Sequence, residues 1–108
     1  YKEWTRETAV YPTGKVTVHG TKIDLEEQYL IMGLANEVGE FLGKCKKQMR
    51  GDGVTMDDKV GELGDIFWYL ARLIDTYGLR HQDVLHANFV KLVDRKNRGV
   101  LKGDGDNR

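Results

Sequence analysis

Two short acidic motifs constrain what this chain can fold into and do. Glu37 and Glu40 form the first, Glu62 and Asp65 the second, and each pair lies three residues apart in a largely apolar segment. Residues at this spacing lie on one face of a helix, so two antiparallel helices would bring both pairs together. Four like charges inside a bundle repel and are costly to desolvate unless cations neutralise them. The pattern therefore predicts a divalent-metal site.

Length and charge limit the classes of protein to which the chain can belong. It has 108 residues, enough for one domain, and its 17 basic and 17 acidic side chains balance. A balanced charge predicts neither nucleic acid nor membrane as a partner. The lone cysteine, Cys45, excludes an internal disulfide and a cysteine-rich zinc module. No apolar run is long enough to span a bilayer. We expect a small soluble domain in the cytoplasm.

The first 23 residues form an N-terminal arm whose pattern is weak. Trp4, Ala9 and Val10 predict a short helix that ends before Pro12, the only proline. Residues 15–19 alternate polar and apolar side chains, which fits either a short strand or an extended loop. Packing or an oligomer contact is the ordinary role for such an arm.

Three helices are expected over residues 24–98. The first starts at the capping residue Asp24 and ends at the break 51–53, the second runs from about Met56 to Tyr77, and the third covers residues 81–97. The second is apolar nearly all round, which is typical of a helix buried on several sides or at a subunit interface. We expect an all-α domain over residues 1–108, a small helical bundle whose core is completed by oligomerisation. A Gly-rich basic tail, residues 99–108, follows it.

The chemistry of phosphate binding is suggested by the third helix. Mg²⁺ prefers carboxylate oxygens and commonly shares its coordination shell with phosphates. Asn88 and Lys91 are three residues apart and Arg95 follows one turn later, so an amide and two cations share a face that suits a nucleotide. Tyr69, one turn after Asp65, either packs in the core or contacts a base.

Other sites are less well supported by the sequence. No Walker loop, no dinucleotide-binding glycine motif and no His-Glu-x-x-His zinc motif is present. A di-iron bundle would need Glu-x-x-His ligands, which are absent. For Lys44, Lys46 and Lys47, a solvated helix end is a more ordinary interpretation than phosphate binding.

Taken together and in order, these motifs resemble the MazG-like family of all-alpha nucleoside triphosphate pyrophosphohydrolases. The family signature is Glu-Glu-x-x-Glu, a spacer and Glu-x-x-Asp; here it begins Asn36-Glu37-x-x-Glu40 and continues Glu62-x-x-Asp65. The third-helix segment 88–92 and the end of the chain, 94–108, also match. Asn36 departs from the longest form of the signature, so the residue that activates water stays open.

The resemblance implies hydrolysis of a nucleoside triphosphate, with ribose or deoxyribose, to the monophosphate and pyrophosphate. It implies Mg²⁺, with Mn²⁺ as a possible substitute, held by Glu37, Glu40, Glu62 and Asp65. Glu37 or Glu40 would assist the attacking water, Asn88 would contact the nucleoside, and Lys91 and Arg95 the phosphates. Members assemble as homodimers or homotetramers, and a nucleotide-pool cleansing role follows. Alternatives are a phosphoribosyl-ATP pyrophosphohydrolase and a non-catalytic helical module that binds metal or nucleotide.

Overall fold

The computed structural model of the chain describes residues 1–108 and divides them into two compact units, residues 1–77 and 78–108. The single domain expected from the sequence stays a prediction. Four helices and one two-stranded sheet form the elements, in the order α1 (Lys2–Glu7), β1 (Lys15–Val18), β2 (Thr21–Asp24), α2 (Leu25–Met49), α3 (Met56–Thr76) and α4 (His81–Asn97).

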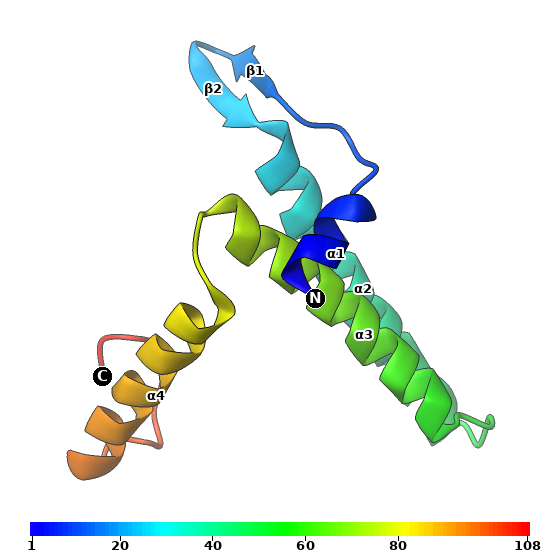
Figure 1. Ribbon diagram of the computed structural model, residues 1–108. Helices are drawn as coiled ribbons and strands as arrows, with labels where there is room; N and C mark the ends of the chain where they lie inside the picture. Colours follow the sequence, from blue (N-terminus) through cyan, green and yellow to red (C-terminus); the bar gives the residue numbers. More distant parts are fainter. The chain divides into compact units, whose positions relative to one another are not determined.

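In the first unit, α2 and α3 form an antiparallel pair, and α1 packs against α3 (Figure 1). The ends of both long helices follow local sequence signals. Asp24 caps α2 because its Oδ1 accepts the main-chain N–H groups of Glu26 and Glu27 at 3.0 and 3.4 Å. Thr55 and Asp58 form a reciprocal capping box at the start of α3. The predicted ranges of these helices are therefore confirmed within a residue or two.

The arm contains a β-hairpin, which corrects the expectation of an all-α chain. Strands β1 and β2 pair antiparallel, with Lys15 opposite Asp24 and Val18 opposite Thr21. His19 and Gly20, the two residues between the strands, have φ of 48° and 80°. Two consecutive positive φ values are typical of the tight turn that matches the twist of a hairpin. The chain is thus predominantly helical with a small sheet, and the extended segment 15–19 is mostly strand.

The start of the chain is tied to α3 by a buried charge network. Arg72 is only 6% exposed, and its Nη1 donates to Asp75 Oδ2 at 2.6 Å. Arg6 on α1 donates to both Asp75 oxygens, at 2.7 and 2.6 Å. The hydrogen bonds from Arg6 and Arg72 hold the pKa of Asp75 well below its usual range despite burial. The short helix α1, which ends before Ala9 and Val10, is positioned by this network.

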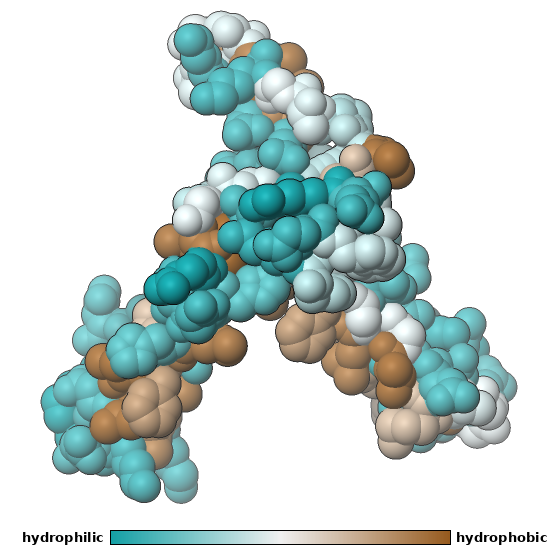
Figure 2. Space-filling model, in the orientation of Figure 1, coloured by the Kyte–Doolittle hydropathy of each residue, from teal (hydrophilic) through white to brown (hydrophobic).

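The core of the first unit is small, and much apolar surface stays exposed. Leu30, Ala71 and Leu73 are its buried apolar residues. Large apolar side chains recur on α3 every three or four residues and remain exposed; they are Val60, Leu63, Phe67 and Leu70. Apolar surface is visible along the α2–α3 pair and along α4 (Figure 2). Contiguous apolar surface of this kind often marks an interaction site. The predicted completion of the core by oligomerisation stays a prediction.

The second unit consists of α4 and the tail, which returns along the helix (Figure 1). The bounds of α4 are those predicted. Arg95 is 5% exposed, and its Nη2 donates to the main-chain oxygen of Asp106 at 3.0 Å. Arg108 donates to the main-chain oxygens of Val100 and Gly105 at 3.0 and 2.7 Å. The tail is therefore a hydrogen-bonded loop. No helix combines the length and the apolarity that a membrane-spanning segment requires.

Candidate metal centre

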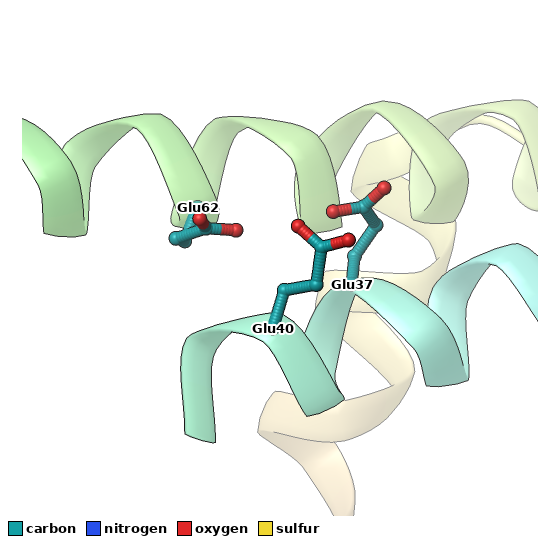
Figure 3. A group of neighbouring side chains, drawn as sticks. All are labelled: Glu37, Glu40 and Glu62. Atoms are coloured by element: carbon teal, nitrogen blue, oxygen red, sulfur yellow. The ribbon is translucent and has the colours of Figure 1, made fainter. Parts of the chain in front are cut away.

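Three of the four predicted acids converge between α2 and α3. Glu37 and Glu40 extend from successive turns of α2 toward Glu62 on α3 (Figure 3). Each offers a carboxylate oxygen, and these oxygens lie within 4.8 Å of one another. The i, i+3 spacing places the first two on one face of α2, and the antiparallel pairing of the helices brings the third opposite them. We refer to these three residues as the glutamate cluster.

Two oxygens of the glutamate cluster are buried without a hydrogen-bond partner. These are Oε2 of Glu37 and Oε2 of Glu62, whereas Glu40 is exposed. Burial raises the pKa of Glu37 above its usual value, and the charges of Asp65, Glu40 and Glu62 raise it further. A buried acceptor without a donor is costly. The cluster thus contains two buried acceptor oxygens whose hydrogen-bonding capacity is unsatisfied.

Asp65 and Asn36 lie at the edge of this arrangement. Asp65 is exposed and is not among the residues whose ligand atoms converge, although its charge contributes to the raised pKa of Glu37. Asn36 is exposed on α2 next to the cluster in sequence. The structure therefore brings together three of the four predicted ligands, and the participation of Asp65 stays a prediction.

A groove next to the cluster contains two lysines. It has a volume of about 360 Å³ and is lined by Glu40, Gly43, Lys44, Lys47 and Glu62. We call it the lysine groove. Neither lysine forms an ion pair within 4.0 Å. The pKa of Asp58 is lowered mainly by its hydrogen bonds with Thr55, and the charges of the two lysines lower it further.

Sequence reasoning favoured a solvated helix end for these lysines. The signal that could have identified them is their spacing from the first acidic motif. Lys44 follows Glu40 by four residues and Lys47 follows it by seven, so all three share one face of α2.

Tyr69 has a structural role in the first unit. A Cβ on Gly33 would lie 2.0 Å from Tyr69 Cε1, so the absence of a side chain at Gly33 lets the ring pack on α2. The ring contacts Trp68 and Tyr29, with centroids 5.0 and 6.4 Å away. Burial, followed by a hydrogen bond with Tyr29, raises the pKa of Tyr69. Its contact with a base stays a prediction.

The three predicted phosphate and nucleoside contacts, Asn88, Lys91 and Arg95, all belong to the second unit. Asn88 and Lys91 line a pocket of about 530 Å³ along α4. Lys91 donates from Nζ to Asp106 Oδ1 at 3.0 Å, and Arg95 donates to the same oxygen at 3.2 Å. The two cations thus converge on one carboxylate oxygen of the tail, which the sequence did not predict. That these three residues bind a substrate stays a prediction.

Comparison with known proteins gives one relative of nearly equal length. The chain is 40% identical over 114 residues to the Gene 37 protein of Mycobacterium phage L5, covering 100% of this chain and 96% of the phage protein. The chain belongs to the family of this phage protein. No family model matches the chain. No solved structure matches it either.

The glutamate cluster fits a hard divalent cation. Its three donors are all carboxylates, two of their oxygens are buried without a donor, and no histidine or cysteine belongs to the group. Oxygen-only ligand sets suit Mg²⁺, and secondarily Mn²⁺, better than zinc or copper. Opposite charge at this point would also lower the raised pKa of Glu37 and relieve the repulsion within the cluster.

Proposed function

We propose that the chain is a Mg²⁺-dependent nucleoside triphosphate pyrophosphohydrolase of the MazG-like type, which hydrolyses its substrate to the monophosphate and pyrophosphate. The observation that supports this best is the glutamate cluster, in which carboxylates from two helices meet within 4.8 Å with two unpartnered buried oxygens. The ordered motif match described above supplies the reaction. Mn²⁺ is expected to substitute for Mg²⁺.

In this proposal Glu37, Glu40 and Glu62 hold the cation, and Asp65 completes the set. The bound cation would neutralise charge on the phosphate chain and acidify water. Glu37 or Glu40 would assist the attacking water, as the motif match implies, and Glu37 is the less exposed of the two. The attack would be directed at the alpha phosphorus, and pyrophosphate would leave.

The lysine groove suits the departing end of the substrate. Lys44 and Lys47 have no ion pair of their own and line the same groove as Glu40 and Glu62. Lysine is a flexible point charge that binds phosphate well. Asn88, Lys91 and Arg95 would contact the nucleoside and phosphates, and Tyr69 would contact the base.

The proposed assembly is a homodimer or homotetramer in the cytoplasm. Val60, Leu63, Phe67 and Leu70 follow heptad-like spacing on α3 and are between 40% and 62% exposed. A second copy covering this stripe would complete the small core, since such spacing suits helix pairing. The physiological role that we favour is cleansing of unwanted nucleotides, since the proposed reaction removes nucleoside triphosphates.

The proposal is tested by incubating the purified chain with Mg²⁺ and a panel of common and modified nucleoside triphosphates, with phosphoribosyl-ATP included. We expect monophosphate plus pyrophosphate in equal amounts. Diphosphate plus phosphate would point to another reaction, and cleavage of phosphoribosyl-ATP alone would favour the alternative enzyme. A folded chain that binds nucleotide but turns over nothing in the panel would be a non-catalytic module.

Matched variants separate the site from general effects of charge. Glu62→Gln should abolish turnover and leave the chain folded, because it removes one charge from a repulsive cluster. Lys44→Gln should raise KM at least about tenfold if the lysine contacts a phosphate directly. Lys46→Gln removes the same charge from α2 outside the lysine groove and should change KM by less than about twofold. Equal effects of the two lysine variants would contradict the role assigned to the groove.

A further inference from the structure

The tail of the second unit places a carboxylate where two cations meet. Oδ1 of Asp106 accepts from Lys91 Nζ at 3.0 Å and from Arg95 Nη2 at 3.2 Å. One oxygen bridging a lysine and an arginine is also how a terminal oxygen of a phosphate is commonly bound. The tail therefore supplies, from within the chain, the kind of oxygen that an anionic ligand would bring.

The loop that contains Asp106 is held together by hydrogen bonds. Arg108 donates to the main-chain oxygens of Val100, Leu101 and Gly105 at 3.0, 3.4 and 2.7 Å, so the end of the chain closes back on the start of the tail. Gly105 has a φ of 80°, a conformation that L side chains rarely adopt, directly before Asp106. The sequence thus specifies a turn that directs this carboxylate toward α4.

The two sides of the contact differ in exposure. The side chain of Arg95 is 6% exposed, whereas that of Asp106 is 80% exposed. The guanidinium is also held by main-chain oxygens of Gly105 and Asp106, at 3.4 and 3.0 Å. An ion pair with one partner this exposed is weak. A multiply charged anion can reach Lys91, whose side chain is 39% exposed. It can contact the buried Arg95 only as Asp106 and the tail move away, so anion binding displaces the carboxylate.

We propose that Asp106 is a built-in competitor for a phosphate-chain site formed by Lys91 and Arg95, and that residues 99–108 are a strap released when a phosphate ligand binds. The identity of the anion rests on the proposed function, whereas the site itself does not. Asn88 and Lys91 line the 530 Å³ pocket on α4, so a ligand held by the cations would have space beside them. Substrate binding and release of the strap are then coupled, and the strap lowers the apparent affinity by the fraction of time that it is closed.

The test measures binding of inorganic pyrophosphate to the full chain without metal, by calorimetry and by the amide resonances of Gly105 and Asp106. Asp106→Asn should tighten pyrophosphate binding by about two- to fivefold, because it removes a competing charge of a partly exposed pair. Asp104→Asn is the matched control, since it removes the same charge from the same loop at a residue without a hydrogen bond or ion pair to α4. It should change affinity by less than about 1.5-fold.

Three results would overturn the inference. They are weaker or unchanged binding in Asp106→Asn, an equal gain in both aspartate variants, and unchanged binding in Lys91→Gln. Amide shifts of Gly105 and Asp106 that move with pyrophosphate in the natural sequence would support release of the strap. Turnover of nucleotides without an Asp106 effect would refute this inference alone. An Asp106 effect without turnover of any nucleotide would refute the proposed function alone.

Discussion

Replacing Glu37 by glutamine tests whether repulsion between the carboxylates of the glutamate cluster destabilises the folded chain. The variant keeps the shape of the side chain and removes the charge that Asp65, Glu40 and Glu62 oppose. In the absence of metal we expect it to raise the stability of the folded chain. An acid that served only to hold the helices together would give the opposite sign.

The magnitude follows from the geometry of the cluster. The carboxylate oxygens lie within 4.8 Å of one another. At that upper limit two unit charges repel by about 0.9 kcal/mol at the dielectric constant of water and by about 3.5 kcal/mol at an effective value of 20. Glu40 is exposed, so the lower figure suits its pair with Glu37. We expect the free energy of unfolding to rise by about 1–2 kcal/mol. In a domain of this size each kcal/mol raises Tm by roughly 4–8 °C.

The assay is thermal and urea unfolding followed by circular dichroism, with and without Mg²⁺. A ligand that binds only the folded state stabilises it by about 2.7 kcal/mol at one hundred times its Kd. The natural sequence should therefore gain stability with Mg²⁺, and Glu37→Gln should gain far less. The difference in unfolding free energy between the two proteins should then shrink or change sign.

Glu7→Gln is the control, because Glu7 is exposed on α1 and forms no ion pair. It should respond to Mg²⁺ as the natural sequence does. A loss of stability in metal-free Glu37→Gln, or an equal response of both variants to Mg²⁺, would refute the reasoning.

Two further predictions concern the framework that holds the cluster. Asp75→Asn should cost about 3 kcal/mol because it removes the anion nearest to the buried guanidinium of Arg72. Asp52→Asn breaks an ion pair that is 56% exposed on both sides and should cost less than about 1 kcal/mol in urea unfolding. Because the pKa of Asp75 is lowered in the folded chain, its stabilisation is complete above about pH 4 and is lost as the pH falls further, so Asp75→Asn should flatten acid unfolding. Gly33→Ala should cost about 1–3 kcal/mol, since its Cβ would meet Tyr69 at 2.0 Å. A Cβ on Gly39 would meet nothing within 4 Å, so Gly39→Ala should raise the stability by up to about 1 kcal/mol. Equal effects of the two glycine variants would argue against the packing of Tyr69 on α2.

Much of the helical framework could be predicted because its signals are local. Asp24 caps α2 through the main-chain N–H groups of Glu26 and Glu27, two and three residues further on. Gly78, with a φ of 71°, follows the end of α3 as the sequence indicated. The sequence predicts a strand or loop over residues 15–19 but not its partner β2, because the pairing depends on the turn at His19 and Gly20. Arg72 and Asp75 are three residues apart on α3, but the sequence does not show that Arg6, 69 residues from Asp75, completes their network.

The sequence by itself determined which acids share a helix face, because spacing along one helix fixes the direction of its side chains. It also determined the breaks that make α2 and α3 neighbours. Only the tertiary structure decided that Glu62 meets Glu37 and Glu40, with Asp65 outside the group, since that depends on how far one helix is shifted along the other. The tertiary structure likewise decided that Lys44 and Lys47 line the groove beside these acids, and that Asp106 reaches Lys91 and Arg95. Each of these contacts joins separate segments, and no local pattern of charge or hydrophobicity specifies their distance.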